Sequence, residues 1–331
     1  MQIALFGPTG QVGQSILHAL LSTTPYQILQ ITSPRSNTSA LSTAQTLPLE
    51  QQSRLNTKSI DLVTCTTDAL IPLLTDIEII ISALNGPALH SQSKIQDAGA
   101  ITGVRRFYPS EYGMHHVYQP AEQGDGKGCG WGYIHPTWME KITATEKCLH
   151  HPAITSGSMT YTIIGSGDLY NQAKEETWCP WTNPTLPSYT IYIIGDPSAK
   201  INFTHTDDLA AFLIQTIQHP EVSENKELNF VSDTVSYNDI AALLEKYSGR
   251  EVQKVVYPGS LVDEVLRDRG MVPREVKAEG GAFGDDFWVL VRGVQGLGRF
   301  VRPRGMVHNG LFPVVEGVRT VEGYFGGLFG K

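Results

Sequence analysis

The sequence has few cysteines, fewer basic than acidic residues, and no long apolar run. Its four cysteines are widely spaced among 331 residues and include no Cys-x-x-Cys pair, so we expect neither a disulfide framework nor a metal site. The formal net charge of −8 argues against nucleic acid as a partner, because binding a phosphate backbone needs a clustered basic surface. No stretch approaches the roughly 18 apolar residues of a membrane-spanning helix. We therefore expect a cytoplasmic protein that binds neither membrane nor nucleic acid.

Short apolar runs alternate with helical patterns along the chain. Strands are predicted at Gln2–Phe6, Gln27–Thr32, Glu78–Ser82, Val104–Tyr108, Tyr161–Ile164, Thr190–Ile194, Glu227–Val231 and Val252–Tyr257. Helices are predicted at Gln11–Leu21, Asp68–Leu74, Ser91–Ala98, Pro136–Leu149, Asp207–Gln218 and Tyr237–Tyr247. This alternation is typical of an α/β, Rossmann-type, doubly wound parallel sheet. We expect residues 1–160 to form that domain, and residues 161–331 to complete its sheet and add a smaller C-terminal substrate-binding lobe.

A glycine-rich turn follows the first predicted strand directly and opens a helix. It runs Gly7-Pro8-Thr9-Gly10-Gln11-Val12-Gly13, with the spacing Gly-x-x-Gly-x-x-Gly. Such glycines permit a tight turn, close approach of the backbone to a pyrophosphate, and close helix packing, while N–H groups at the helix start face the phosphates. The sequence therefore predicts a dinucleotide site with Gly7, Thr9, Gly10, Gln11, Val12 and Gly13 as cofactor-binding residues. The alternative is a purely structural turn.

The end of the second predicted strand indicates which dinucleotide is bound. No Asp or Glu stands about 20 residues after the glycines to hold a ribose 2′-hydroxyl, and Ser33-Pro34-Arg35-Ser36 occupies this region instead. A guanidinium can grip a 2′-phosphate through two parallel hydrogen bonds. We therefore expect NADP(H) as the cofactor, with Ser33, Arg35 and Ser36 at the 2′-phosphate. The alternative is that Arg35 is a solvated turn residue.

One segment carries a family resemblance. Residues Gly103-Val104-Arg105-Arg106-Phe107-Tyr108-Pro109-Ser110-Glu111-Tyr112-Gly113 resemble the signature G-V-x-R-F-x-P-S-E-[FY]-G of NmrA-like and isoflavone-reductase-like proteins, an atypical branch of the short-chain dehydrogenases/reductases. With the glycine turn, the resemblance covers roughly residues 1–165. It implies that Ala83, Asn85, Pro109 and Ser110 also contact the cofactor. The chain departs from the family pattern after this segment, where His115 and His116 stand in place of the usual acidic residue.

The catalytic candidate is a lysine. The Tyr-x-x-x-Lys pair of most short-chain dehydrogenases is missing, since His116 stands four residues after Tyr112 and Thr137 four residues after Tyr133. The resemblance implies a helix lysine about thirty residues after Pro-Ser-Glu as general acid/base and cofactor contact, and Lys141 falls there.

The helix pattern agrees with this role. Trp138, Ile142, Thr145 and Leu149 form an apolar stripe that puts Lys141 at the edge of the buried face and Lys147 on the solvent face. A lysine beside apolar surface has a lowered pKa, which suits proton transfer. The alternative is an amphipathic lysine that merely snorkels.

The stretch Gly113–Pro136 is rich in glycine and aromatic residues, and is a candidate lid over the site. A disordered surface insertion is the alternative. The predicted substrate-binding residues are Tyr112, His115, Trp131, Tyr133, Trp138 and Tyr170. Each of these aromatic residues could instead belong to the core.

The resemblance implies an NADPH-dependent reductase of secondary metabolism. Its substrate would be a small, mostly apolar or aromatic natural-product intermediate that accepts hydride at a C=C, C=N, C=O or cyclic ether carbon. Two alternatives stay open: a dinucleotide-sensing regulatory protein without turnover, and an isomerase or cyclase on the same fold. We expect a monomer or a homodimer.

Overall fold

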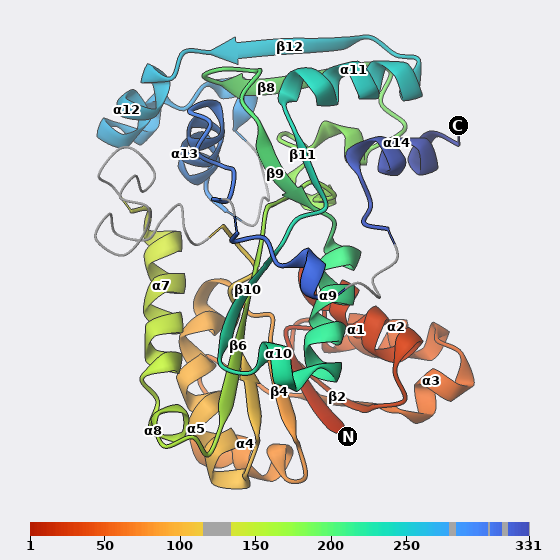
Figure 1. Cartoon of the computed structure of the whole chain (residues 1–331), viewed down its shortest axis with the longest axis vertical. Helices are drawn as coiled ribbons and strands as arrows, with labels where there is room; N and C mark the ends of the chain where they lie inside the picture. The colour runs from red at the N-terminus through yellow and green to blue at the C-terminus, as the bar shows by residue number, and fades with distance from the viewer. Residues whose placement is uncertain (115–133, 278–282, 304, 313–316, 331) are drawn as a thin grey trace.

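The computed structural model describes residues 1–114, 134–277, 283–303, 305–312 and 317–330. It has two lobes (Figure 1): a larger one around a seven-stranded sheet, and a smaller one that lies beyond one end of that sheet. The strands of the large sheet are β1 (Gln2–Phe6), β2 (Gln27–Thr32), β3 (Leu55–Ser59), β4 (Ile79–Ser82), β5 (Arg106–Tyr108), β6 (Thr160–Ser166) and β10 (Lys226–Phe230).

All neighbouring strands of this sheet pair in parallel, in the order β10-β6-β5-β4-β1-β2-β3. The strand β1 lies inside the sheet, where Ile3 pairs with Ile28 of β2 on one side and with Ile79 of β4 on the other. The chain therefore winds outward from β1 in both directions, which is the doubly wound arrangement of a Rossmann-type sheet. This topology confirms the predicted fold class.

Helices cover both faces of the sheet, as parallel strands require. One face carries α1 (Gln11–Thr23) and α9 (Thr206–Gln218), whose buried residues share one hydrophobic cluster with the strands. The other face carries α4 (Thr67–Leu74), α5 (Gln92–Thr102) and α7 (Pro136–Leu149). Shorter helices complete the lobe: α2 (Asn37–Thr46), α3 (Leu49–Ser53), α8 (Pro152–Thr155) and α10 (Pro220–Ser223).

Within the described residues, the smaller lobe is built from two small sheets and four α-helices, with short 3-10 turns between them. One sheet joins β7 (Asp168–Leu169), β9 (Ile201–Thr204) and β11 (Asp233–Val235), and the other joins β8 (Tyr189–Ile194) and β12 (Val252–Tyr257). The helices are α11 (Tyr237–Ser248), α12 (Ser260–Arg267), α13 (Asp285–Gly296) and α14 (Val321–Phe329). Their shared core is rich in aromatic side chains, and α13 is buried along most of its length. Within the described residues, no helix has the length and apolar character that crossing a membrane would need.

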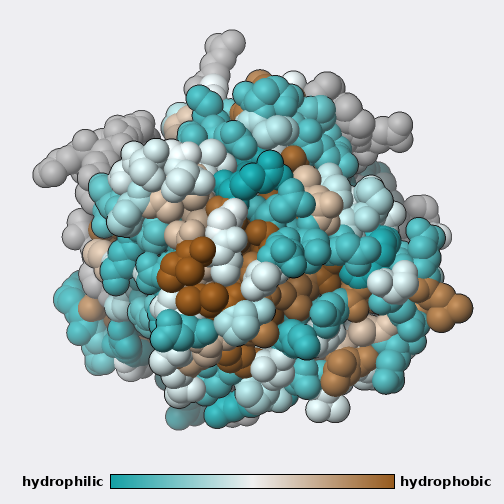
Figure 2. Space-filling model, turned by 90° about the horizontal axis from the view of Figure 1, so that it is seen from below, coloured by the Kyte–Doolittle hydropathy of each residue, from teal (hydrophilic) through white to brown (hydrophobic). Residues whose placement is uncertain are grey.

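The two ends of the large sheet differ. The carboxyl ends of its strands face the smaller lobe, whereas the opposite end is open to solvent (Figure 1). Seen from that open end, the surface is largely hydrophilic with apolar side chains gathered near the middle (Figure 2). In sheets of this kind, ligands bind outside the carboxyl ends of the strands, where the strand order reverses. The candidate site is therefore sought between the two lobes.

Candidate functional site

A cavity of about 300 Å³ lies between the lobes, at the carboxyl ends of β1, β4, β5 and β6. The large lobe contributes Gly10, Gln11, Val12, Ala83, Leu84, Asn85, Ser110, Glu111, Tyr112, Gly113 and Met114, with Thr137, Trp138 and Lys141 from α7. The smaller lobe contributes Gly167, Asp168, Leu169, Gln172, Lys174, Glu175, Phe283, Phe287, Trp288, Val291 and Phe300. The cavity thus lies between loops and α7 of the large lobe on one side and aromatic and polar residues of the smaller lobe on the other.

Two of the three glycines in the turn after β1 lie too close to main-chain atoms of the protein to carry a side chain. Gly7 has a φ of +79°, and a Cβ there would lie 2.5 Å from the carbonyl oxygen of Ala83. A Cβ on Gly13 would lie 2.0 Å from the carbonyl oxygen of Gly7. At Gly10 a Cβ would meet only carbonyl oxygens at 3.4 and 3.9 Å, which is ordinary contact. The chain's own packing therefore requires glycine at positions 7 and 13 but not at position 10, which is the position that faces the cavity.

Helix α1 begins at this turn with its first N–H groups unprotected by any capping side chain. Its first turn also lacks acidic residues, so the positive end of the helix dipole is not neutralised. Gln11 and Val12 of this turn line the cavity. A helix start of this kind binds phosphate groups well.

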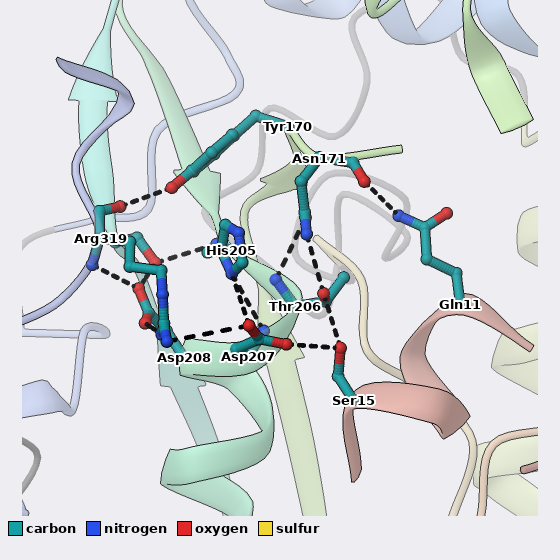
Figure 3. Close-up of polar contacts among 10 residues, drawn as sticks. Gln11, Ser15, Tyr170, Asn171, His205, Thr206, Asp207, Asp208 and Arg319 are labelled. Atoms are coloured by element: carbon teal, nitrogen blue, oxygen red, sulfur yellow. Dashed lines mark hydrogen bonds and ion pairs between the residues drawn. The ribbon is translucent and has the colours of Figure 1, made fainter. Parts of the chain in front are cut away.

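Polar contacts tie α1 to the smaller lobe and to α9 (Figure 3). The Gln11 side chain donates to the carbonyl oxygen of Asn171 at 3.1 Å, and the Asn171 amide donates to the Thr206 hydroxyl at 2.9 Å. Ser15 lies within 2.8 Å of both the Thr206 hydroxyl and the Asp207 carboxylate. These hydrogen bonds therefore hold the start of α1 against the segment after β7 and against the start of α9.

The same network continues to the segment before α14. Arg319 donates from Nη1 to Asp208 at 2.6 Å, and its carbonyl oxygen accepts the Tyr170 hydroxyl at 2.7 Å. The Tyr170 ring is buried and packs edge-on against Phe203 and His205. Tyr170, expected at the substrate, lies in the core and does not line the cavity.

The residues expected at a 2′-phosphate lie at the carboxyl end of β2, next to the glycine turn on β1. Ser33 and Arg35 are exposed, and the hydroxyls of Ser33 and Ser36 are 2.9 Å apart. Helix α2 follows directly, and its first turn has no capping side chain. These three residues extend the strand edge beyond the cavity and do not line it.

The segment after β5 is fixed by hydrogen bonds from two neighbouring elements. The Ser110 N–H donates to Oε1 of Gln92 at 2.8 Å, and the Ser110 hydroxyl donates to the carbonyl oxygen of Leu84 at 2.6 Å. Tyr112 has a φ of +51°, which is unusual for a residue other than glycine, and its N–H donates to the carbonyl oxygen of Ile164. These contacts aim the carbonyl oxygens of Ser110 and Glu111 toward α7.

Lys141 reaches this segment from α7. Its Nζ donates to the carbonyl oxygen of Glu111 at 2.6 Å and to that of Ser110 at 3.3 Å. An ammonium has three N–H groups, so one more can serve a ligand in the cavity. Burial lowers the pKa of Lys141 from its ordinary value, and the nearby Glu111 carboxylate opposes that shift. The arrangement places a proton donor with a lowered pKa at the carboxyl end of the sheet.

Aromatic rings form the wall of the smaller lobe. Trp138 of α7 meets Phe287 of α13 edge-on, with ring centroids 5.6 Å apart, and Phe287 also packs against Phe283 at 4.8 Å. His135, which caps α7 by accepting the Thr137 N–H, lies 3.2 Å from Asp286 of α13. Helices α7 and α13 are therefore joined at the cavity. Sequence reasoning anticipated only Trp138 of this wall.

A buried polar cluster stands beside these rings. The carboxylate of Asp168 contacts Gln172, Arg292 and Gln295, and Glu175 accepts the indole N–H of Trp288 at 2.9 Å. Sequence reasoning missed this cluster, because it joins two segments more than 100 residues apart and follows no motif. The near-continuous apolar run around Arg292 was the one available signal, since a charge there must be paired.

The predicted site residues fall into three groups. Those that line the cavity are Gly10, Gln11, Val12, Ala83, Asn85, Ser110, Tyr112, Trp138 and Lys141. Those that lie apart from it are Gly7, Thr9, Gly13, Ser33, Arg35, Ser36, Pro109 and Tyr170. His115, Trp131 and Tyr133, with most of the expected lid, lie outside the described residues. Among the residues that the structure describes, no three His, Cys, Asp or Glu side chains gather in a group able to hold a metal.

Comparison with known proteins finds similar sequences and similar folds. Residues 136–279 match the model of the NmrA-like family. A phenylcoumaran benzylic ether reductase of Pinus taeda is 23% identical over 277 residues, which are 81% of each chain. Eugenol synthase 1 of Petunia hybrida is 25% identical over 217 residues, 62% of this chain but only 61% of that relative.

A solved structure of similar fold is the binary complex of leucoanthocyanidin reductase and NADPH from Vitis vinifera. It aligns over 100% of both chains with 20% sequence identity and a TM-score of 0.70. A crystal structure of isoflavone reductase aligns over 98% of each chain at a TM-score of 0.70. These findings confirm the resemblance predicted from the sequence: part of the chain matches the NmrA-like family model, and the whole chain shares its fold with these solved reductases.

Proposed function

We propose that this chain is an NADP(H)-dependent reductase of a small, mostly apolar, aromatic substrate, with Lys141 as the general acid. The observation that carries the proposal is the Lys141 ammonium, held on the carbonyl oxygens of Ser110 and Glu111 inside a cavity at the carboxyl ends of the strands. A regulatory protein that only senses the dinucleotide has no need of a proton donor there. The relatives named as reductases support the same class of reaction.

The residues present fit a dinucleotide. The uncapped start of α1 and the open position at Gly10 suit a pyrophosphate, because N–H groups can donate to it at close range. Arg35, with Ser33 and Ser36, would hold the 2′-phosphate, and Ala83, Asn85 and Ser110 would line the other end of the groove. When bound, the reduced cofactor would supply a hydride to the substrate.

The chain's own contribution is orientation and one proton. Lys141 Nζ gives a proton to the substrate atom on which negative charge develops, and solvent then returns a proton to the amine. The lowered pKa of Lys141 favours this transfer, because the amine gives up its proton more readily than an exposed lysine does. Trp138, Phe287 and Trp288 exclude water from the reacting atoms and offer flat apolar surface to an aromatic ring.

The test follows NADPH consumption with a panel of aromatic enones, imines, ketones and cyclic ethers. Lys141→Met keeps the length of the side chain and removes its charge, so kcat should fall by about 10²–10⁴-fold while NADPH affinity changes much less. Lys147→Met is the matched control, because Lys147 is exposed on the same helix. The kcat of the wild type should also fall as pH rises through the lowered pKa of Lys141, and the variant should lack this limb.

Three results would contradict the proposal. Equal rates in the wild type and Lys141→Met would remove the lysine from proton transfer. Tight NADPH binding with no compound reduced would favour a sensing protein. A substrate rearranged without NADPH consumption would favour an isomerase or cyclase.

A further inference from the structure

We propose that Asp168 forms a subsite for a hydroxyl group of the substrate, on the smaller-lobe side of the cavity. The inference rests on the proposed function only in taking this cavity as the substrate site. The ligand group that this subsite would take is the hydroxyl of a phenol or an alcohol, which donates one hydrogen bond. The geometry of the carboxylate, its partners and its charge balance each point to this class.

Asp168 is held rigidly at the cavity. It is the first residue of β7 and follows Gly167, where a Cβ would lie 2.3 Å from the carbonyl oxygen of Asn202 on β9. The backbones of the two strands therefore meet at a fixed point immediately before the carboxylate. Asp168 lines the cavity, and the residue is only 8% exposed. A ligand that reaches it meets a carboxylate with little competing water.

The hydrogen bonds of this carboxylate are uneven. Oδ2 accepts from Nε2 of Gln295 at 2.8 Å and from Nη1 of Arg292 at 3.3 Å. Oδ1 accepts one long hydrogen bond, from Nε2 of Gln172 at 3.3 Å. A carboxylate oxygen has about two acceptor positions, so Oδ1 can take a further and better donor. Because an ionised carboxylate only accepts, that donor must bring an O–H or N–H.

The charge balance favours a neutral donor over a cation. The side chain of Arg292 is fully buried and lies over the rings of Trp178, Tyr237 and Trp288, at 5.4, 5.2 and 5.5 Å from their centroids. It donates to Asp168, so the pair carries no net charge. A cationic ligand therefore gains little from this pair, whereas a hydroxyl gains a charge-assisted hydrogen bond. A carboxylate brought by a ligand would be repelled by Asp168.

Together with Lys141, this subsite would orient the substrate. The cavity then offers a proton donor on α7, an acceptor on β7, and aromatic rings of α13. An aromatic molecule with a hydroxyl remote from its reacting atom matches all three. A purely structural role, in which Asp168 only neutralises Arg292, predicts no preference for a hydroxyl and is distinguished by the following measurement.

The probes are 4-propylphenol and its methyl ether, 4-propylanisole, which differ in one hydrogen-bond donor. Calorimetry with the full chain, with and without saturating NADPH, gives the ratio of their dissociation constants. We expect the phenol to bind about tenfold more tightly or better. A ratio near one, or no detectable binding of the phenol, would overturn the subsite.

Removing Asp168 alone would leave the Arg292 charge buried and unpaired, which can unfold the protein. The variant is therefore the double replacement Asp168→Leu with Arg292→Met, since apolar residues of similar size often replace a buried ion pair at no cost in stability. The phenol preference should fall to about one in this variant, with its melting temperature as the check on folding. The control Glu176→Gln alters an exposed carboxylate nearby that does not line the cavity, and should leave the preference unchanged.

A phenol preference that survives the double replacement would also overturn the subsite. The two proposals fail in distinguishable ways. A wild-type protein that does not bind NADPH would contradict the proposed function, while the ratio measured without NADPH still judges the subsite.

Discussion

The two walls of the cavity are built by different means. The large-lobe wall combines the glycine turn after β1 and the Ser110–Tyr112 segment after β5 with side chains of α7, and the turn and the segment are set by short sequence motifs. The smaller-lobe wall is side chain, from β7 and α13, and its contacts join residues more than 100 positions apart, such as Asp168 and Arg292. Under the proposed function, the first wall would bind groups that every dinucleotide shares, and the second would distinguish one substrate from another.

This difference predicts unequal tolerance to substitution. At the glycine turn, where a ligand would approach the main chain closely, one added carbon would block that approach. A side-chain wall can repack around a changed residue, and the cost is then a modest change in affinity. The predictions below test the two walls in turn, starting with the largest effect.

The largest effect is expected in the glycine turn. Gly10→Ala should leave the melting temperature nearly unchanged, because its Cβ meets only ordinary contacts, yet weaken NADPH binding by about a hundredfold through lost phosphate contacts. Gly13→Ala should instead destabilise the fold by about 1–3 kcal/mol, since its Cβ overlaps the Gly7 carbonyl group. Thermal unfolding and calorimetry separate the two. Equal melting temperatures for both variants would contradict the packing argument.

The next effect concerns the 2′-phosphate. Arg35→Ala should cost about 1.5–3 kcal/mol of NADPH binding, or about tenfold to a hundredfold in affinity, and leave NADH binding almost unchanged. Arg35 is exposed, so the fold should not suffer. Calorimetric titration of the wild type and the variant with both cofactors measures this. If NADH and NADPH weaken equally, Arg35 does not contact the 2′-phosphate.

A smaller effect is expected on the side-chain wall. Phe287→Leu keeps an apolar side chain but removes part of the ring stack with Phe283 and Trp138. The KM for an aromatic substrate should rise by about fivefold, corresponding to about 1 kcal/mol of lost contact. NADPH affinity should not change. A loss of NADPH binding equal to the loss of substrate binding would show that the two walls are not independent.

The smallest expected effect is a pH dependence of the free energy of unfolding, caused by His205 at the contact between the lobes. His205 caps α9 by accepting the Asp207 N–H at Nδ1, and burial lowers its pKa below the ordinary 6.5, although Asp207 and Asp208 oppose that shift. As pH falls, His205 of the unfolded chain therefore takes up a proton before His205 of the folded chain does. The contribution of the neutral His205 to the free energy of unfolding is present above pH 6.5 and is lost as pH falls below it.

His205→Asn keeps a good capping residue and removes the titration. The drop in unfolding free energy between pH 7.5 and 5.5 should be smaller in this variant than in the wild type, by about 1 kcal/mol or less. Denaturant unfolding at the two pH values measures the difference. An identical drop in both proteins would exclude His205 as a contributor.

The sequence predicted the large lobe better than the smaller one, for physical reasons. Strands β1 and β4 are apolar and end in turns, and α7 has a clear apolar stripe, so local patterns were enough. Strand β3 (Leu55–Ser59) was missed, because it is polar, lies at the sheet edge and is defined by its pairing with β2. Helix α13 was missed because it lies in the glycine-rich stretch near the C-terminus, where the composition suggested turns, although most of its residues are buried in the fold.

The candidate site likewise contains residues that sequence motifs predicted and residues that only the fold brings together. Lys141, Gly10 and Ser110 were predicted from motifs and lie at the cavity. Asp168 and Phe287 belong to no motif, and only the folded chain brings them there. Tyr170 was expected at the substrate because it is aromatic, yet its hydroxyl is used by the Arg319 carbonyl group. An aromatic residue is therefore weak evidence of a binding site unless its position in the fold is known.

The most direct test of the central claim is isotope transfer. A compound from the panel that the protein consumes is converted with NADPH deuterated at C4, in separate experiments for each of the two C4 hydrogens, and the product is analysed by mass spectrometry. The account predicts one deuterium in the product from one of the two labelled cofactors, and a second hydrogen from solvent through Lys141. A product that carries no deuterium from either cofactor would contradict it.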